Sequence, residues 1–199
     1  MREEIPVDGS AHWGRIYTLL TATIVPRPIA WVSSRSADGV PNLAPHSFFT
    51  VASADPATIQ FTSVGRKDSL ANIEATGEFV VCLTPLGLID EVNASGTNYP
   101  PDVDEFDAVG LAREPSATVA PERVAGSPVA LECTLAGTHE IGNSTVVFGR
   151  VTHIAIDRAV MADDGLPDIH ALAPVARLGR NEWSLLGEVR RIDRIPYED

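Results

Sequence analysis

The chain has 199 residues, 44% of them hydrophobic, so it is long enough to bury a core without disulfides or metal ions. Its 27 acidic and 15 basic residues give a net charge of −12, which repels phosphate backbones and anionic lipid surfaces. The longest uncharged apolar stretch, Phe79 to Ile89, has 11 residues, whereas a membrane span needs about 20. The composition therefore predicts a globular protein that binds neither nucleic acid nor membrane.

The N-terminus, Met1 to Glu4, is acidic and leads into no apolar signal core, so we expect a cytoplasmic protein. Cys82 and Cys133 each lie in an apolar run, which indicates buried reduced thiols rather than a disulfide or a metal pair. No CxxC or His-x-His spacing supports a metal site. Of the 15 basic residues, all but Lys67 are arginine.

In chain order, the spacing of apolar residues predicts several short elements. Prolines and glycines, 15 of each, separate runs that are mostly rich in β-forming residues, which favours a barrel or a sandwich. The expected elements are a helix over Trp13–Leu20, strands over Ile29–Ser34 and Thr58–Ser63, a helix over Asp68–Ala75, a strand over Glu78–Thr84, a helix over Leu88–Ala94, and strands over Val129–His139 and Thr145–Ile156. The fold class is therefore mainly β with short helices.

Two further stretches bear on the domain organisation. The acid-rich stretch from Asp90 to Glu114 is interpreted as a long surface connection, not a boundary, because strands on both sides are needed to close one barrel. Residues 1–199 are thus expected to form a single domain. The C-terminal stretch from Leu172 to Tyr197 mixes arginines with Trp183 and leucines, so we expect it to pack on the body or on a second subunit.

The segment from Asn42 to Thr50 is the first candidate for a ligand site. Polar side chains and proline-fixed backbone alternate there with apolar residues, a mixture that can present amides and hydroxyls to a flat polar ligand. A hairpin turn at Asp38-Gly39 followed by an ordinary strand explains the same residues. The residues alone leave both interpretations open.

The second candidate is the run from Thr62 to Ser69, where a strand ends and a helix begins. Hydroxyls, the two cations Arg66 and Lys67, and free helical N–H groups together indicate an anion site. A helix capped by Asp68 or Ser69 with solvated charges is the alternative, and Gly77 is expected to end that helix.

No catalytic constellation is evident in the sequence. The five histidines are scattered, and there is no G-x-S-x-G nucleophile motif, no G-x-G-x-x-G dinucleotide motif and no G-x-x-x-x-G-K-S/T phosphate loop. We therefore expect no catalytic side chain and no metal. If the protein is an enzyme, a cofactor performs the chemistry.

A series of short segments spans almost the whole chain. They are Tyr17–Leu20, P-R-P-I-A-W-V-S-S from Pro26, Asp38-Gly39, N-L-A-P-H-S-F-F from Asn42, K-D-S-L-A-N-I from Lys67, Glu78–Val81, Asp104–Phe106, Ser127-Pro128 with Glu132-Cys133, F-G-R-V from Phe148, and Arg177–Gly179. By their order and spacing the sequence resembles the flavin reductase-like family, whose members share an FMN-binding split β-barrel and include the flavoredoxin-like proteins.

The resemblance implies a homodimer with FMN near the subunit interface. It implies transfer of a hydride from NADH or NADPH to the flavin, with reduced flavin or electrons passed to a flavin-dependent monooxygenase or another acceptor. An FMN-binding electron carrier that does not react with nicotinamide nucleotides, or a split barrel that binds haem or pyridoxal phosphate, are the alternatives.

The resemblance also implies roles for residues of both candidate segments. Against the isoalloxazine ring it places Ala44, Pro45, His46, Ser47, Phe48 and Phe49. Near the ribityl chain and the phosphate it places Thr62, Ser63, Lys67 and Ser69, with Asp68 as helix cap and orienter of the lysine. Arg177 would reach the cofactor from the C-terminal segment of the same or the partner subunit, and Trp31 would pack beside the flavin or in the core.

Overall fold

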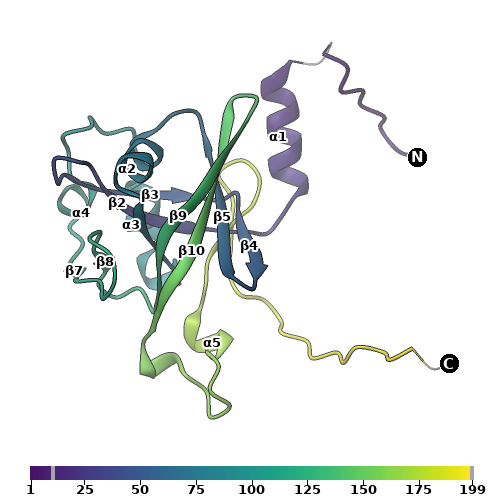
Figure 1. The fold of residues 1–199 in the computed structure, drawn as a ribbon. Helices are drawn as coiled ribbons and strands as arrows, with labels where there is room; N and C mark the ends of the chain where they lie inside the picture. Colours follow the sequence, from purple (N-terminus) through teal and green to yellow (C-terminus); the bar gives the residue numbers. More distant parts are fainter. Residues whose placement is uncertain (10–11, 198–199) are drawn as a thin grey trace.

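The computed structural model describes residues 1–9 and 12–197, and its largest element is a seven-stranded antiparallel sheet (Figure 1). The strand order is β3-β2-β6-β9-β10-β5-β4. The strands are β2 (Ala30–Arg35), β3 (Pro41–His46), β4 (Phe49–Ala54), β5 (Ala57–Val64), β6 (Glu78–Cys82), β9 (Val129–Ile141) and β10 (Ser144–Ile156). The expected mainly β fold class is confirmed.

The two edge strands of this sheet are neighbours in the chain. Only Ser47 and Phe48 separate β3 from β4, and the three peptide units from His46 to Phe49 span at most about 11 Å. The sheet must therefore curl until its edges approach each other. The backbone N–H of Thr62 in β5 donates to the Phe48 carbonyl at 2.9 Å beside this junction. The result is a barrel that is split between β3 and β4.

Short helices and small sheets surround the barrel. The helices are α1 (Trp13–Thr23), α2 (Asp68–Thr76), α3 (Ile89–Ala94), α4 (Glu105–Ala108) and α5 (Ile169–Leu172), with 3₁₀ turns at Leu86–Leu88 and Arg158–Val160. One small hairpin joins β7 (Arg113–Glu114) and β8 (Arg123–Val124). A three-stranded sheet combines β1 (Arg27–Pro28), β11 (Ala176–Arg177) and β12 (Trp183–Ser184). In Figure 1, α1 and the C-terminal segment lie on the opposite side of the β9–β10 hairpin from α3, α4 and β7–β8.

The elements predicted from apolar spacing all correspond to observed ones, and their ends differ by no more than three residues. Spacing did not identify β3 and β4. The hairpin interpretation of the Asp38-Gly39 turn is confirmed, because Gly39 has φ 88° and the Ser36 N–H donates to the Val40 carbonyl at 2.8 Å. β3 follows this turn directly.

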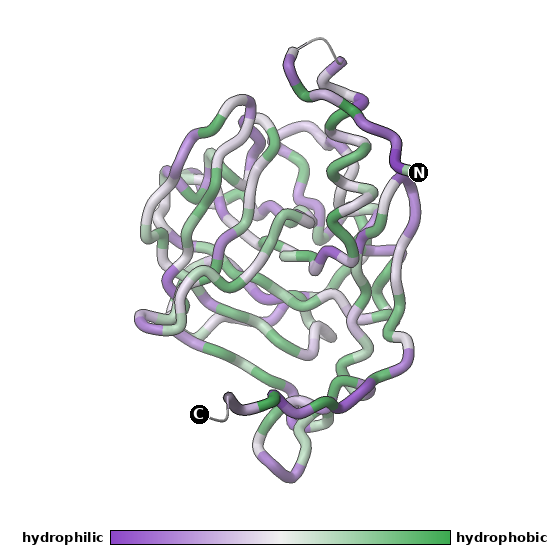
Figure 2. The backbone as a smooth tube through the Cα atoms, turned by 90° about the vertical axis from the view of Figure 1, so that its right-hand side faces the viewer, coloured by the Kyte–Doolittle hydropathy of each residue, from purple (hydrophilic) through white to green (hydrophobic). Residues whose placement is uncertain are grey.

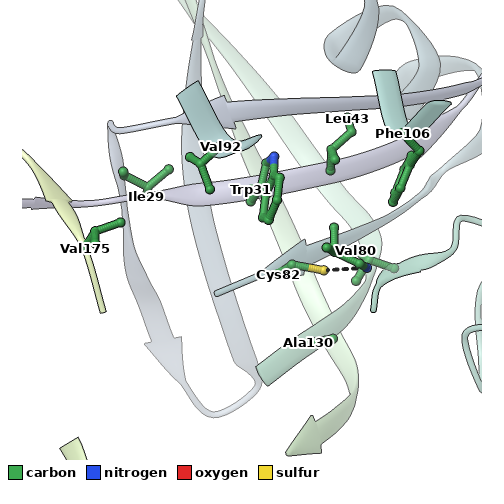
Figure 3. Close-up of a cluster of buried hydrophobic side chains, with 10 residues drawn as sticks. Ile29, Trp31, Leu43, Val80, Cys82, Val92, Phe106, Ala130 and Val175 are labelled. Atoms are coloured by element: carbon green, nitrogen blue, oxygen red, sulfur yellow. Dashed lines mark hydrogen bonds between the residues drawn. The ribbon is translucent and has the colours of Figure 1, made fainter. Parts of the chain in front are cut away.

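The start of strand β2 lies between two hydrophobic clusters, which explains the unbroken apolar run from Ile29 to Val32. Ala30 and Val32 belong to a cluster inside the barrel, whereas Ile29 and Trp31 belong to a cluster under α3, α4 and β8 (Figure 3). Since successive side chains of a strand point to opposite faces, burial of both faces gives no polar alternation. Trp31 is fully buried in this core, and its indole N–H donates to the Ser95 hydroxyl at 2.9 Å.

The two cysteines are buried free thiols, as expected, and they lie in different clusters. Cys82 accepts a hydrogen bond from the Val124 backbone N–H at 3.4 Å, drawn as a dashed line in Figure 3. Burial raises the pKa of each thiol to about 12.

The stretch from Asp90 to Glu114 was expected to be a surface connection, and this is only partly correct. Its helix α4 folds back on β3, so that Phe106 is fully buried against Leu43 and Val124 and Glu105 is 5% exposed. The high density of acids concealed these two buried positions in the sequence.

The C-terminal stretch packs back on the body only as far as Ser184, through the pairing of β11 with β1 and of β12 with β11. From Leu185 to Tyr197 it forms no helix or strand and extends away from the body in Figure 1. Ile192 and Ile195 are exposed there, and the apolar side chains of α1 are also at the surface, where several turns of the helix are green in Figure 2. Within the described residues, no helix has the length and apolar character needed to cross a membrane.

Candidate functional site

A polar pocket lies where the split of the barrel meets the turn from β5 into α2. Its volume is about 500 Å³. The end of β3 with Ser47 and Phe48 lines the pocket, and so does the start of α2 with Lys67. The fold therefore brings together the two candidate segments that the sequence singled out separately.

Most of the predicted site residues line this pocket. They are Ala44, Pro45, His46, Ser47, Phe48, Thr62, Lys67, Asp68 and Ser69. Phe49, Ser63 and Arg177 do not line it. Phe49 packs against the cluster inside the barrel, and Ser63 is fully buried, where its hydroxyl donates to the Gly65 carbonyl at 2.8 Å. Arg177 lies on β11, with its guanidinium 4.6 Å from the ring centre of Trp183.

The alternation of β5 explains why Ser63 turns away while its neighbours face the pocket. Ile59, Phe61 and Ser63 are buried at every second position, and Thr62 and Val64 point to the opposite face and line the pocket. The two-residue period of the strand therefore places Thr62 in the pocket wall and Ser63 in the core.

The start of α2 has no side-chain cap, in contrast to the expectation for Asp68 or Ser69. Lys67 occupies the capping position, Asp68 is the first helical residue, and the Ser69 hydroxyl donates instead to Asn42 Oδ1 at 2.9 Å. The first N–H groups of the helix consequently have no side-chain acceptor. Gly77 ends the helix with φ 75°, as expected.

Two basic side chains, Arg66 and Lys67, line the pocket, and they differ in their pairing. Arg66 pairs with Glu74 at 2.6 Å, whereas Lys67, which is exposed, pairs with no carboxylate among residues 1–9 and 12–197. An unpaired ammonium group beside uncapped helical N–H groups is an arrangement that favours an anionic group.

His46 forms part of the pocket wall and stacks at a tilt on Phe61, with ring centres 4.7 Å apart. Burial, and then the positive charge of Lys67, lower the pKa of His46 to about 4. The imidazole is therefore neutral at neutral pH. Its Nε2 lies 3.4 Å from the Ser69 hydroxyl.

Behind this wall lies a buried hydrogen-bond network centred on Asn42. The Asn42 amide donates to Glu105 Oε1 at 3.0 Å and accepts from Ser69 at 2.9 Å, and the Leu43 backbone N–H donates to Glu105 Oε2 at 2.9 Å. Asn42 and Glu105 both line the pocket. Asn42 was visible in the candidate segment, but nothing local in the sequence indicates that Glu105 reaches it.

Further pocket residues that the sequence did not assign come from α1 and from the end of α3. Tyr17 lies 6.4 Å from Phe48 between ring centres. The others are Ser95, Gly96, Thr97, Asn98 and Tyr99. An apolar groove of about 710 Å³ adjoins the pocket and shares Tyr17, Phe48 and Val64 with it. In the described part of the chain, no three His, Cys, Asp or Glu side chains are grouped as metal ligands would be.

Comparison with known proteins gives a consistent family assignment. The flavin reductase like domain matches residues 22–169. A protein of Halalkalibacterium halodurans without an assigned function is 37% identical over 190 residues, which cover 89% of this chain and 90% of that protein.

Two solved structures resemble the whole chain. Nitrilotriacetate monooxygenase component B from Bacillus cereus has a TM-score of 0.90 at 27% identity, over 96% of this chain and 100% of that one. The 2-nitrobenzoate 2-nitroreductase NbaA from Pseudomonas fluorescens has a TM-score of 0.89 at 26% identity, over 98% of this chain and 96% of that one. These similarities support a flavin-related redox function.

Proposed function

Because the chain belongs to the flavin reductase-like family, we propose that its pocket binds FMN and that the protein is an NAD(P)H-dependent flavin oxidoreductase. The observation that carries this proposal is the unpaired Lys67 at the uncapped start of α2, in the same pocket as the polar β3–β4 junction. Such groups suit a phosphate monoester, and about 500 Å³ is within the range of pockets that hold cofactors.

We assign the phosphate to Lys67, Thr62 and the first N–H groups of α2. The Ser69 hydroxyl is left out, because it donates to Asn42 and is 1% exposed. The isoalloxazine ring is assigned to the wall formed by residues 44–48, where backbone groups and the Ser47 hydroxyl meet its polar edge. Phe48 and Tyr17 supply aromatic contact next to that wall.

When bound, FMN would supply the hydride-transfer chemistry between a nicotinamide ring and the flavin. The chain itself has to hold the two flat rings about 3–3.5 Å apart and to keep water out. No side chain is required to move a proton, which agrees with a buried His46 whose pKa is about 4. A flavin-dependent monooxygenase is the proposed electron acceptor, since the Bacillus cereus neighbour is component B of a monooxygenase.

The phosphate assignment is tested by comparing FMN with riboflavin, which lacks the phosphate. Lys67→Ala should weaken FMN binding roughly tenfold to a hundredfold, the loss of one charge-assisted contact, and leave riboflavin binding unchanged. Arg66→Ala is the matched control, because Arg66 is already paired with Glu74 and should contribute much less. Equal affinity of the unmodified protein for FMN and riboflavin, measured by flavin fluorescence, would contradict the assignment.

The reductase activity is tested by anaerobic stopped-flow mixing of the FMN-loaded protein with NADH and with NADPH. We expect the flavin absorbance to bleach with at least one of the two nucleotides. If the flavin stays oxidised for minutes with both nucleotides but bleaches with dithionite, the protein is an electron carrier and not a reductase.

We further propose that the active form is a homodimer. Trp13 is 70% exposed on α1, and Ile192 and Ile195 are 85% and 93% exposed on the C-terminal segment. Two apolar surfaces are therefore not covered by other described residues of the same chain. The predicted cofactor contact of Arg177 would come from the second copy. Sedimentation at micromolar concentration should give a dimer, and deletion of residues 185–199 should weaken it. A monomer that binds FMN tightly would contradict this proposal.

A further inference from the structure

Glu105 is a buried carboxylate in the wall of the proposed flavin pocket. It begins α4 and is 5% exposed, and α4 packs on β3. Nothing in the proposed reaction uses it. No lysine, arginine or histidine of the described residues forms an ion pair with it, whereas Glu132, which is fully buried, is paired with Arg123.

The hydrogen bonds of Glu105 are those of an ionised group. Oε1 accepts from the Asn42 side-chain amide at 3.0 Å and Oε2 accepts from the Leu43 backbone N–H at 2.9 Å. A protonated carboxyl would need an acceptor for its own O–H, and both of its neighbours are donors. In the structure the Asn42 amide turns its NH₂ group towards Glu105 and its Oδ1 towards the hydroxyls of Ser69 and Ser34, which donate to it at 2.9 Å and 3.3 Å.

The charges around Glu105 do not neutralise it. Asp68, at the start of α2, has the same sign, and burial is the main cause that raises the pKa of Glu105 while the two N–H donors oppose it. Lys67 and Arg66 are both exposed to solvent, which screens their charge. A buried charge is screened much less, so the carboxylate acts on whatever occupies the pocket.

From this geometry we propose that the negative charge of Glu105 makes reduction of the bound flavin less favourable. This proposal rests on the proposed FMN site. Reduction by two electrons with uptake of one proton lowers the charge of the flavin by one. A fixed negative charge in the pocket wall opposes that change, and it does so without contact with the reacting atoms. The reduced cofactor would then be a stronger donor to its acceptor.

The test is the midpoint potential of the bound flavin at pH 8, followed by absorbance during dithionite titration with a reference dye. Glu105→Gln should raise the ratio of the affinity for reduced FMN to the affinity for oxidised FMN roughly tenfold. For a two-electron couple, this change corresponds to a shift of the midpoint potential by about 30 mV in the positive direction. Glu105→Asp keeps the charge and should stay near the wild-type potential. Asp68→Asn, which removes a more exposed carboxylate, should give a smaller shift.

A merely structural role for Glu105 would weaken both flavin states equally and leave the potential unchanged, and that result would overturn the proposal. If Glu105→Gln does not fold, the double variant Asn42→Leu, Glu105→Met removes the charge together with the side chain that donates to it and should show the same positive shift. An unchanged potential in that variant would equally overturn it. Failure of the unmodified protein to bind FMN would instead refute the proposed function.

Discussion

Replacement of Glu132 by glutamine should destabilise the protein strongly at neutral pH. Glu132 in β9 is fully buried and accepts five hydrogen bonds, from the backbone N–H groups of Ala117 and Thr118, from the Thr118 hydroxyl, and from two nitrogens of Arg123. These contacts hold the loop before β8 against the sheet. Glutamine has nearly the same shape, but its NH₂ group replaces one acceptor oxygen, so some of these donors lose their acceptor.

The magnitude follows from the titration of this carboxyl. Burial alone would raise the pKa of Glu132, but the donors from Thr118, Ala117 and Arg123 override it and lower the pKa from 4.5 to about 2. That difference corresponds to about 3 kcal/mol of unfolding free energy. Because the pKa is depressed in the folded state, this stabilisation is fully present above pH 4.5 and is lost as the pH falls towards 2.

Urea unfolding at pH 7, 5 and 4, at one fixed protein concentration, measures this contribution. Glu132→Gln should lower the unfolding free energy by about 3 kcal/mol at pH 7, and the gap to wild type should narrow by pH 4. Glu78→Gln is the matched control, since Glu78 accepts from the Ala120 N–H at 2.8 Å on the same loop but at the surface. Equal losses in the two variants, or a gap that stays constant between pH 7 and pH 4, would refute the reasoning.

Two further outcomes follow from the packing of the barrel interior. Gly149→Ala should destabilise the fold by about 1–3 kcal/mol or prevent folding, because the added Cβ would overlap the buried ring of Phe79. Thermal unfolding measures this loss of stability, and a melting temperature equal to that of the wild type would contradict the prediction. Cys82 and Cys133, whose pKa values are each raised to about 12 by burial, should not react with a thiol reagent until the protein unfolds, and a fast native reaction would show that one of them is accessible.

Local sequence patterns identified the elements of the barrel because their causes are local. Apolar spacing predicted β5, β6, β9, β10 and α2, and the Asp38-Gly39 dipeptide predicted the hairpin before β3. The position of the pocket followed from the family resemblance together with two polar segments. The structure adds the reason that these segments meet, namely that residues 47 and 48 join the two edges of one sheet.

The parts that sequence patterns missed depend on tertiary contacts. Glu105 reaches Asn42 across 63 positions of the chain, and Tyr17 faces the pocket only because α1 lies beside Phe48. The Ser69 hydroxyl donates to Asn42, a partner that the sequence of its own helix does not indicate. The family resemblance places both Thr62 and Ser63 near the cofactor, although the period of two in β5 distinguishes the pocket residue from the buried one.

Arg27 links the pocket to the end of α1 and to the turn between β11 and β12, which precedes the projecting C-terminal residues. Its guanidinium is 8% exposed in a cluster of acceptors, where it donates to the Thr21 carbonyl, to the Ile24 carbonyl at 3.0 Å and to the Leu178 carbonyl at 2.8 Å, while its Nε donates to the Ser47 hydroxyl at 3.3 Å. These partners belong to the end of α1, to the turn between β11 and β12, and to the wall of the proposed flavin pocket.

A ligand that orders Ser47 therefore acts on the same guanidinium that fixes α1 and the C-terminal segment. Binding of FMN and formation of the dimer should be coupled, and the coupling must be reciprocal. We expect FMN to lower the dimer dissociation constant about fivefold or more, measured by sedimentation with and without the cofactor. Arg27→Met should reduce this effect. A dimer dissociation constant that is the same in both conditions would show that Arg27 stabilises the three segments without connecting the cofactor site to the interface.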